Sequence, residues 1–195
     1  MLFITRVIDI VTRRHQPIAN AAVRLIEGCE AEFNFDSGVR RVLVLSGPRE
    51  GRYLPRDRLL FAATVRIAPM PLRAPALREF VFHEMGHAIV EHHEVGDYLG
   101  PFTQRTIDDD AYEEESNAAA ERTRPAGFVS GYATCDREED FCETLAAYLT
   151  NRSTWRTRLS FNGEQIAVRN NARLRRKLDA VHALLGDLHA FTPVG

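Results

Sequence analysis

The stretch His83-Glu84-Met85-Gly86-His87 decides how this chain is interpreted, because its two histidines are four residues apart. On a helix, residues at this spacing lie on one face, so His83 and His87 can present two imidazoles to one metal ion. Glu84 lies on the same helical turn as His83 and faces the open side of such an ion. About 0.02 matches to this pattern are expected by chance in a chain of this composition. The pentapeptide therefore predicts a helix that carries a metal site.

Two imidazoles next to a carboxylate are typical of a hydrolytic zinc site. Neutral imidazoles suit Zn²⁺, and a third protein ligand would leave the fourth position of the ion to water. Zinc lowers the pKa of that water from 15.7 to about 7, and a neighbouring carboxylate can take its proton as it attacks a carbonyl. We therefore expect Zn²⁺ as the cofactor, His83 and His87 as ligands, and Glu84 as the general base.

A third ligand is expected from the later stretch Glu139-Asp140-Phe141-Cys142-Glu143. Glu139 and Glu143 share a helical face, so one can bind the metal while the other holds a ligand imidazole by its far N–H. His93 stands at the spacing of a third histidine ligand, but Val90 occupies the position where that arrangement needs a glycine. We therefore expect His93 to belong to a solvated helix end.

The rest of the chain alternates between helical and extended patterns. Helical patterns occur at residues 2–14, 19–26, 75–93, 137–150 and 163–189, and β-branched extended stretches occur at 39–46 and 58–68. The two extended stretches are expected to pair as a hairpin with a long loop in a small sheet. The sheet edge that would align a peptide is expected near residues 58–68.

This order of elements predicts an α+β fold in a single domain spanning residues 1–195. Its catalytic core is expected at about residues 58–150, and its C-terminal helix at about 163–189. Residues 97–135 are expected to be irregular, because glycine and proline interrupt them repeatedly. Asp136 is a good N-cap for the helix that follows.

Composition excludes several other classes of protein. The chain is 45% apolar and 27% charged with a net charge of −2, which is ordinary for a globular domain and argues against a protein that coats nucleic acid. No apolar run reaches the roughly 18 residues of a membrane span, and charges interrupt the first nine residues, unlike a signal peptide. We expect a cytoplasmic protein with neither nucleic acid nor membrane as a partner. Export as an effector without a cleavable signal is the alternative.

The three cysteines and two charged segments give further information about the protein. Cys29, Cys135 and Cys142 form no CxxC pair, which favours a reducing compartment. Residues 108–115 hold six acids and are expected to form a solvated loop, which could also attract a basic substrate. Residues 152–178 carry a local charge of +7 and are expected to form a solvated face.

The stretch Gly127-Phe128-Val129-Ser130-Gly131-Tyr132-Ala133, together with Glu138-Glu139-Asp140-Phe141-Cys142-Glu143-Thr144, resembles a known family. It is similar to the catalytic half of gluzincin metallopeptidases of the anthrax lethal factor type, and equally to small zinc-binding metallopeptidases of bacteria. In these proteins the HExxH motif is followed by a tyrosine that lies seven residues before the first glutamate of an ExxxE helix. Tyr132 has this position relative to Glu139. The resemblance covers about residues 78–150.

The resemblance implies a zincin-like fold, with a small β-sheet, an HExxH helix, a following ExxxE helix and a peptide or protein substrate. It implies His83, His87 and Glu139 as zinc ligands, Glu84 as general base, Tyr132 as the hydroxyl that faces the oxyanion, and Glu143 as the group that orients a ligand. A phenol donor aimed at the oxyanion is typically worth ~3 kcal/mol. Asp140 and Cys142 depart from the family pattern, which often has an aromatic residue and an alanine there.

Two alternatives to a metallopeptidase stay open at this point. The segment Glu27-Gly28-Cys29 is similar to the one that supplies a cysteine ligand in peptide deformylases. A deformylase-like amide hydrolase with Cys29 as ligand is therefore the first alternative. The second is a catalytically inactive protein that keeps zinc as a structural clip and binds a partner.

Overall fold

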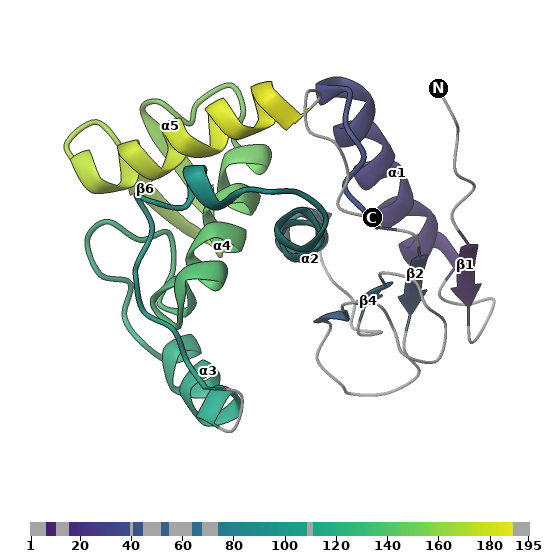
Figure 1. The fold of residues 1–195 in the computed structure, drawn as a ribbon, viewed down its shortest axis with the longest axis horizontal. Coiled ribbons are helices and arrows are strands. Elements are labelled where there is room, and N and C mark those ends of the chain that lie inside the picture. Colours follow the sequence, from purple (N-terminus) through teal and green to yellow (C-terminus); the bar gives the residue numbers. More distant parts are fainter. Residues whose placement is uncertain are drawn as a thin grey trace.

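One central helix organises the part of the chain that the structure describes. The computed structural model describes residues 7–10, 16–39, 41–44, 52–54, 64–67, 74–108 and 111–188. Within these ranges the elements are β1 (Val7–Ile10), α1 (Gln16–Phe33), β2 (Arg41–Val44), β3 (Arg52–Leu54), β4 (Thr64–Ile67), α2 (Ala74–His92), the 3₁₀ turn Gly96–Tyr98, α3 (Tyr112–Ala120), the 3₁₀ turn Tyr132–Thr134, α4 (Arg137–Thr150), β5 (Arg158–Phe161), β6 (Glu164–Ala167) and α5 (Ala172–Asp187). Figure 1 shows α2 end-on, with α1 and the larger sheet on one side and α4 and α5 on the other. The predicted α+β class, with a small sheet, an HExxH helix, a following ExxxE helix and a helical C-terminus, is confirmed.

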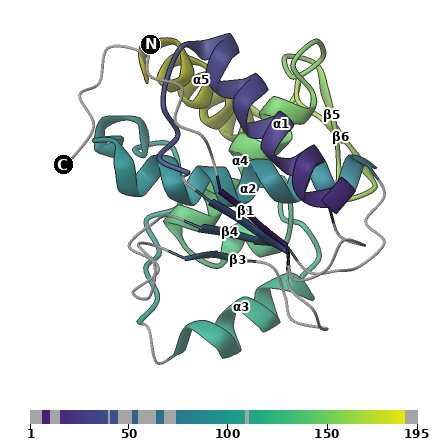
Figure 2. The same ribbon diagram turned by 90° about the vertical axis from the view of Figure 1, so that its right-hand side faces the viewer.

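The larger sheet has the strand order β1-β2-β4-β3. β1 and β4 both run parallel to β2, whereas β3 runs antiparallel to β4. The hairpin expected between residues 39–46 and 58–68 is therefore wrong, because parallel strands cannot be joined by a hairpin. β4 has a neighbouring strand on each side, so among the described strands β1 and β3 form the edges of the sheet. The sheet edge expected near residues 58–68 is therefore not β4 but its neighbour β3. Figure 2 views the molecule from the side of the larger sheet, whose strands lie in front of α2.

The first predicted helix, at residues 2–14, is also wrong for the part that the structure describes. Val7–Ile10 is strand β1, paired with β2 in the register Val7 to Arg41 and Ile10 to Val44. Its apolar residues fit a helical spacing, but they are β-branched, and a neighbouring strand is available to pair with them. The helix expected at 19–26 is confirmed and is longer than expected, since α1 runs from Gln16 to Phe33.

The two helices that carry the motifs match their predicted ranges. α2 spans Ala74–His92, against an expected 75–93, and α4 spans Arg137–Thr150 as expected. Asp136 is the N-cap of α4: its carboxylate accepts a hydrogen bond from the backbone N–H of Glu139 at 2.8 Å. The cap fixes where α4 begins, and thereby fixes the position of Glu139 in its first turn.

Gly86 allows α2 and α4 to pack unusually close together. A Cβ atom built on Gly86 would lie 2.8 Å from the sulfur of Cys142 and 3.1 Å from the Cα of the same residue. A larger side chain at residue 86 would therefore push the helices apart. Cys142, the departure from the family pattern, is fully buried against this glycine.

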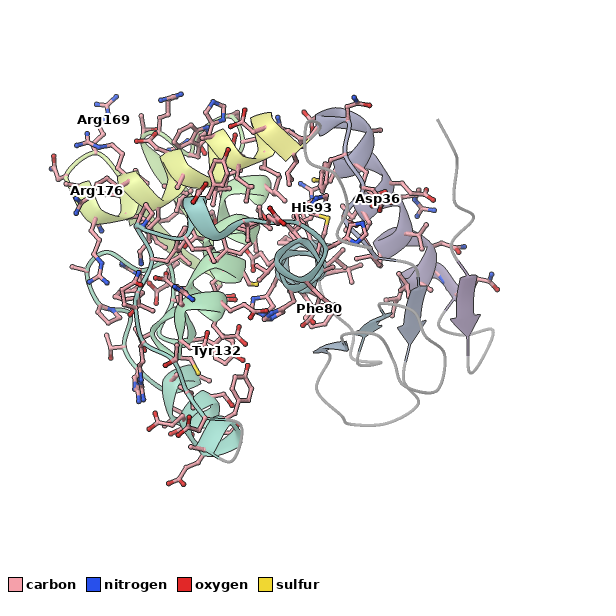
Figure 3. The ribbon with its side chains drawn as sticks, viewed as in Figure 1. Asp36, Phe80, His93, Tyr132, Arg169 and Arg176 are labelled. Carbon is pink, nitrogen blue, oxygen red and sulfur yellow. The ribbon has the colours of Figure 1, made fainter. Side chains whose placement is uncertain are left out.

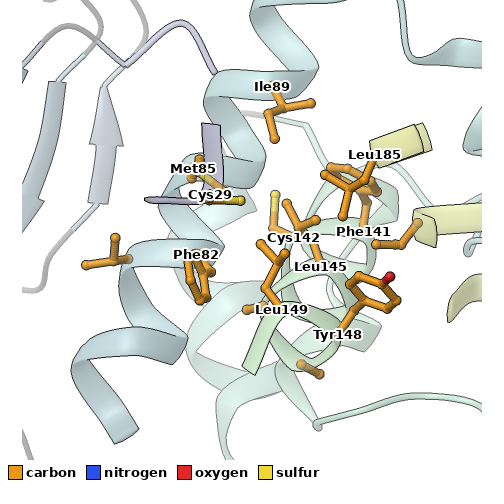
Figure 4. Close-up of a cluster of buried hydrophobic side chains, with 14 of the residues drawn as sticks. Cys29, Phe82, Met85, Ile89, Phe141, Cys142, Leu145, Tyr148, Leu149 and Leu185 are labelled. Atoms are coloured by element: carbon orange, nitrogen blue, oxygen red, sulfur yellow. The ribbon is translucent and has the colours of Figure 1, made fainter. Parts of the chain in front are cut away.

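Apolar side chains from both helices form the core on either side of this contact. Figure 4 shows Phe82, Met85 and Ile89 of α2 beside Cys142, Leu145 and Leu149 of α4. Burial of one such large side chain contributes about 1.5–3 kcal/mol. Leu185 of α5 and Cys29 of α1 complete the same cluster, so α2 and α4 are held from both sides.

A hairpin replaces the start of the predicted C-terminal helix. β5 and β6 pair antiparallel around Asn162 and Gly163, which have φ angles of 49° and 77°. Two positive φ angles are what a type I′ turn requires, and Asn-Gly is the pair that best adopts them. The helix expected at about 163–189 therefore begins only at Ala172, after the N-cap Asn171, and α5 ends at Asp187.

The acidic segment forms a helix where a loop is expected. α3 spans Tyr112–Ala120 and ends in three alanines, which favour the helix. Glu115 accepts a hydrogen bond from Arg105 at 2.7 Å and lies 3.4 Å from the guanidinium of Arg122. These ion pairs hold α3 against the rest of the chain, and the expectation of an irregular stretch over 97–135 is wrong here. No helix in the described ranges has both the length and the apolar character needed to cross a bilayer.

A buried ion pair connects α4 to α5. Lys177, the single lysine of the chain, and Asp140 are both fully buried, with 2.7 Å between the ammonium nitrogen and a carboxylate oxygen. Asp140 also accepts the backbone N–H of Thr103 at 2.9 Å, and the Lys177 nitrogen lies 3.7 Å from the ring centre of Phe128. Burial raises the pKa of Asp140 and lowers that of Lys177, although each charge favours ionisation of the other. Neither charge would be tolerated there alone.

Replacing Lys177 should therefore destabilise the fold strongly. We expect Lys177→Met to lower the free energy of unfolding by about 3–5 kcal/mol, because it leaves the Asp140 carboxylate buried without a cation. Urea denaturation of the metal-free protein, followed by circular dichroism, measures the change.

The double variant Lys177→Met/Asp140→Asn is the control. It removes both charges and keeps an acceptor for the Thr103 N–H, so it should recover most of the lost stability. Equal destabilisation of the single and double variants would contradict an effect of the buried charge.

Candidate active site

His83 and His87 project from one face of α2 toward the first turn of α4. Their Nε2 atoms lie 3.3 Å apart, and the two rings meet edge to face with 5.0 Å between their centres. Both are partly buried. Two ring nitrogens that face each other at this distance need a cation or a proton between them, because their lone pairs would otherwise repel.

Glu139 completes a group that could hold a metal ion. Its carboxylate oxygens lie 3.2 Å from Nε2 of His83 and 3.7 Å from Nε2 of His87. Ligand atoms at about 2.0–2.2 Å from a tetrahedral zinc ion would be ~3.3 Å apart, so the three side chains fit such an ion. Glu139 Oε2 is also buried without a hydrogen-bond partner, as expected of an atom that faces an ion. Among the described residues, this is the one group of three potential ligands within 4.8 Å of one another.

The electrostatics of the group favour a positive charge at its centre. Burial alone would lower the pKa of His83, but the carboxylates of Glu139 and Glu143 raise it well above its usual value. Burial alone would raise the pKa of Glu139, but His83 and His87 lower it to about 2, so the carboxylate stays ionised. The same carboxylate that would attract a proton to the histidines would attract a metal cation in its place.

Carboxylates on the outer side fix the orientation of both imidazoles. Nδ1 of His83 lies 2.9 Å from Glu143 Oε1, and Nδ1 of His87 lies 2.7 Å from Glu138 Oε1. A carboxylate only accepts, so each Nδ1 carries the proton, and Nε2 is the unprotonated nitrogen of the neutral ring. Outer carboxylates of this kind orient ligand histidines at metal sites.

Glu143 is itself held by the segment before α4. Its other oxygen accepts a hydrogen bond of 2.6 Å from the hydroxyl of Ser130, which in turn accepts the backbone N–H of Ala133 at 2.9 Å. Ser130 and Glu143 are both buried. The orientation of His83 is therefore tied to the backbone of the segment that also carries Tyr132.

Glu84 combines burial with an unused oxygen. Its side chain is 4% exposed, and its Oε2 atom has no hydrogen-bond partner in the structure. Burial raises the pKa of Glu84 to about 7, although His83 and His87 act in the opposite direction. A carboxyl group with a pKa near neutrality can both accept and return a proton at physiological pH.

Two tyrosine hydroxyls lie beside Glu139. Tyr132 donates a hydrogen bond of 3.2 Å to Glu139 Oε1, and the hydroxyl of Tyr112 in α3 donates to the same oxygen. The two hydroxyls are 3.2 Å apart. Burial, followed by the charge of Glu139, raises the pKa of both phenols, so both keep their protons and act as donors.

A cavity of about 780 Å³ opens beside this group. His83 and Glu84 line it from α2, and Tyr132 lines it from the segment before α4. The turn of the β5-β6 hairpin closes another side with Phe161 and Asn162. Its volume falls within the usual range of ligand-binding pockets, so a substrate of several atoms can reach His83 and Glu84.

Two other sequence candidates lie away from the group. Cys29 packs in the hydrophobic core (Figure 4) and does not belong to the His83-His87-Glu139 group, and burial raises the pKa of its thiol to about 12. The expectation of a solvated His93 is wrong, because this residue is 3% exposed and its Nε2 donates a hydrogen bond of 2.6 Å to the backbone carbonyl of Asp36 (Figure 3). His93 thus ties the end of α2 to the residues after α1.

A comparison with protein families agrees with this geometry. The family described as "Putative zinc-binding metallo-peptidase" matches residues 73–188. The chain belongs to this metallopeptidase family. The match begins beside the start of α2 and ends with α5, so it includes every residue of the His83-His87-Glu139 group and leaves out the larger sheet. No curated protein and no solved structure matches the chain significantly.

Three residues that contact the group or Glu143 have no role in the sequence prediction. Glu138 precedes Glu139 and fits the acidic first turn of a helix. Ser130 belongs to the stretch 127–133 that carries the family resemblance, and Tyr112 belongs to the acidic segment 108–115. The motif spacing could have indicated Ser130, since it is two residues before Tyr132. Tyr112 depends on the position of α3, which no local pattern predicts.

Metal content distinguishes Glu139 from Cys29 as the third ligand. We expect Glu139→Ala to lose bound zinc on dialysis, because two histidines alone hold the ion weakly, whereas Cys29→Ala should keep about one zinc per chain. Elemental analysis of protein purified without a metal-binding tag measures this. Loss of zinc from Cys29→Ala and retention by Glu139→Ala would contradict the assignment.

Proposed function

We propose that this chain is a zinc-dependent metallopeptidase of the gluzincin type that hydrolyses peptide bonds with an activated water molecule. The observation that carries the proposal is the unpartnered, buried Oε2 atom of Glu84 beside the His83-His87-Glu139 group. A structural zinc site needs no such carboxylate, whereas a hydrolytic site needs a base at this place. Membership of the zinc-binding metallopeptidase family supports the same conclusion.

In this proposal His83, His87 and Glu139 hold the metal. When bound, zinc lowers the pKa of water and polarises the substrate carbonyl. Glu143 and Glu138 keep the two imidazoles in the tautomer that leaves Nε2 for the ion, because each accepts the proton at Nδ1.

Glu84 takes the proton of the attacking water at Oε2. Burial raises the pKa of Glu84 from its usual value, which makes the carboxylate a stronger base for this proton, and the same group can then deliver the proton to the leaving amine. The low exposure of Glu84 keeps bulk water from competing for the proton.

Tyr132 supplies a hydrogen bond to the carbonyl oxygen as negative charge develops on it. It lines the cavity, and its hydroxyl lies 3.2 Å from both the Glu139 carboxylate and the Tyr112 hydroxyl. A substrate oxygen in the cavity would offer a better acceptor as its charge grows, so the bond strengthens in the transition state.

The two alternatives receive less support. A deformylase-like hydrolase would need Cys29 as ligand, but this side chain is packed in the core. An inactive zinc-stabilised binding protein gives no reason for the buried Glu84 carboxylate. We also propose that residues 1–195 act as one metallopeptidase domain, with the larger sheet supporting α2 from outside the family match.

Glu84→Gln tests the proposed chemistry. We expect this variant to keep zinc and its fold but to lose hydrolysis of a degenerate peptide mixture by at least about 1000-fold, because the amide cannot accept the proton. Mass spectrometry of the mixture follows cleavage, and elemental analysis follows zinc.

Wild-type protein with and without a chelator is the control for contaminating proteases. Equal cleavage by wild type and Glu84→Gln would contradict the role of Glu84. Failure of zinc-loaded wild type to cleave any peptide in the mixture would favour the binding-protein alternative.

The two phenols should differ in their contribution to turnover. We expect Tyr132→Phe to lower kcat by about 100-fold with little change in KM, because its donor acts on charge that exists only in the transition state. Tyr112→Phe is the matched control on the more exposed ring, and it should lower kcat by less than about tenfold. A larger loss for Tyr112→Phe than for Tyr132→Phe would contradict the role given to Tyr132.

A further inference from the structure

The cavity extends from His83 toward the beginning of α2. Glu79 lies one helical turn before His83 and lines the cavity from the same helix. Phe80 and Phe161 line it as well, and Figure 3 shows two of its walls, Phe80 on α2 and Tyr132 on the segment before α4. This part of the cavity therefore combines a carboxylate with two aromatic rings.

The arginines that line the cavity are already paired within the chain. Arg124 contacts Glu164 at 2.9 Å, and Arg122 donates a hydrogen bond of 3.1 Å to Thr134 and lies 3.4 Å from Glu115. Their charges are therefore largely neutralised before a substrate arrives.

Glu79 differs from these groups because the described part of the chain gives it no cation. Its one hydrogen bond comes from the backbone N–H of Asn162 at 3.4 Å, close to the upper limit for such a bond. Its side chain is half-buried, and burial, followed by the nearby charge of Glu143, raises its pKa against the effect of the Asn162 N–H. A cation in the cavity would relieve this unfavourable environment.

We propose that this part of the cavity binds a basic side chain of the peptide substrate, arginine or lysine, with the Glu79 carboxylate as its ionic partner. The proposal rests on the proposed peptidase function and names its substrate class. The methylenes of arginine or lysine would lie against the partly exposed Phe80, and its charged end would reach Glu79. An acidic side chain would be repelled by the carboxylates of Glu79 and Glu143. An apolar side chain would bury the Glu79 carboxylate without giving it an ionic partner.

Binding to a variant that does not turn over separates specificity from catalysis. The probe is a set of short fluorescein-labelled peptides, identical except for Arg, Lys, Leu or Glu at one position that is moved along the chain. Fluorescence anisotropy with zinc-loaded Glu84→Gln protein gives the Kd of each. We expect the Arg and Lys peptides to bind at least about tenfold more tightly than the Leu and Glu peptides at the position that enters the cavity.

Charge variants at Glu79 assign this preference to its carboxylate. In the Glu84→Gln background, Glu79→Gln can still accept the Asn162 N–H, and it should abolish the preference for basic peptides. Glu79→Arg should shift the preference to the Glu peptides. Glu94→Gln makes the same charge change at an exposed carboxylate outside the cavity and should leave the preference intact.

The outcomes separate this inference from the proposed function. Equal binding of all peptides, or a basic preference that survives Glu79→Gln, overturns the inference even if zinc-loaded wild type cleaves peptides. A basic preference that depends on Glu79 supports the inference even if wild type cleaves none of them, and in that case only the peptidase proposal fails. The comparison of Arg with Leu peptides on the Glu84→Gln protein needs no change at Glu79, so it tests the inference even if a Glu79 variant does not fold.

Discussion

The close contact between α2 and α4 at Gly86 is the constraint on which the rest of the structure depends. Gly86 lies between His83 and His87 in sequence, and Cys142, which it contacts, lies three residues after Glu139, so the close contact between the helices lies beside the His83-His87-Glu139 group. A wider crossing would move the first turn of α4 away from the imidazoles. The small residue inside the motif is therefore a requirement of packing, and the metal-binding geometry follows from it.

Hydrogen bonds and one ion pair hold the surrounding segments to this crossing. Ser130 connects Glu143 to the segment before α4, and Gly131 in that segment lies so close to the end of α3 that a Cβ would come within 2.0 Å of the carbonyl oxygen of Arg122. On the other side of α4, Asp140 pairs with Lys177 of α5. Contacts from the segment before α4 and from α5 thus hold α4 in place beside His83 and His87.

The sequence was sufficient for what is local and insufficient for what depends on packing. Both motif helices could be located from the sequence, by the spacing of His83 and His87 and by the capping residue Asp136. Helical periodicity and capping depend only on residues within one helix. The order and direction of the strands, and the place of α3, depend on partners distant in sequence, so no local pattern indicated them. The Asn-Gly turn at residues 162–163 was a readable local signal that the helical spacing of later leucines concealed.

The burial of Lys177 gives the folded chain an unusual chemical property. It is the one lysine among 195 residues; its amine is buried, and the charge of Asp140 favours its protonated form against the effect of burial. Acylating reagents react with neutral, accessible amines, so this side chain can react only in molecules whose α5 has separated from α4. The rate of lysine acylation therefore measures how often the packing behind the ligand group opens. Because the chain has a single lysine, its acylation can be assigned by mass spectrometry of the peptide that contains Lys177.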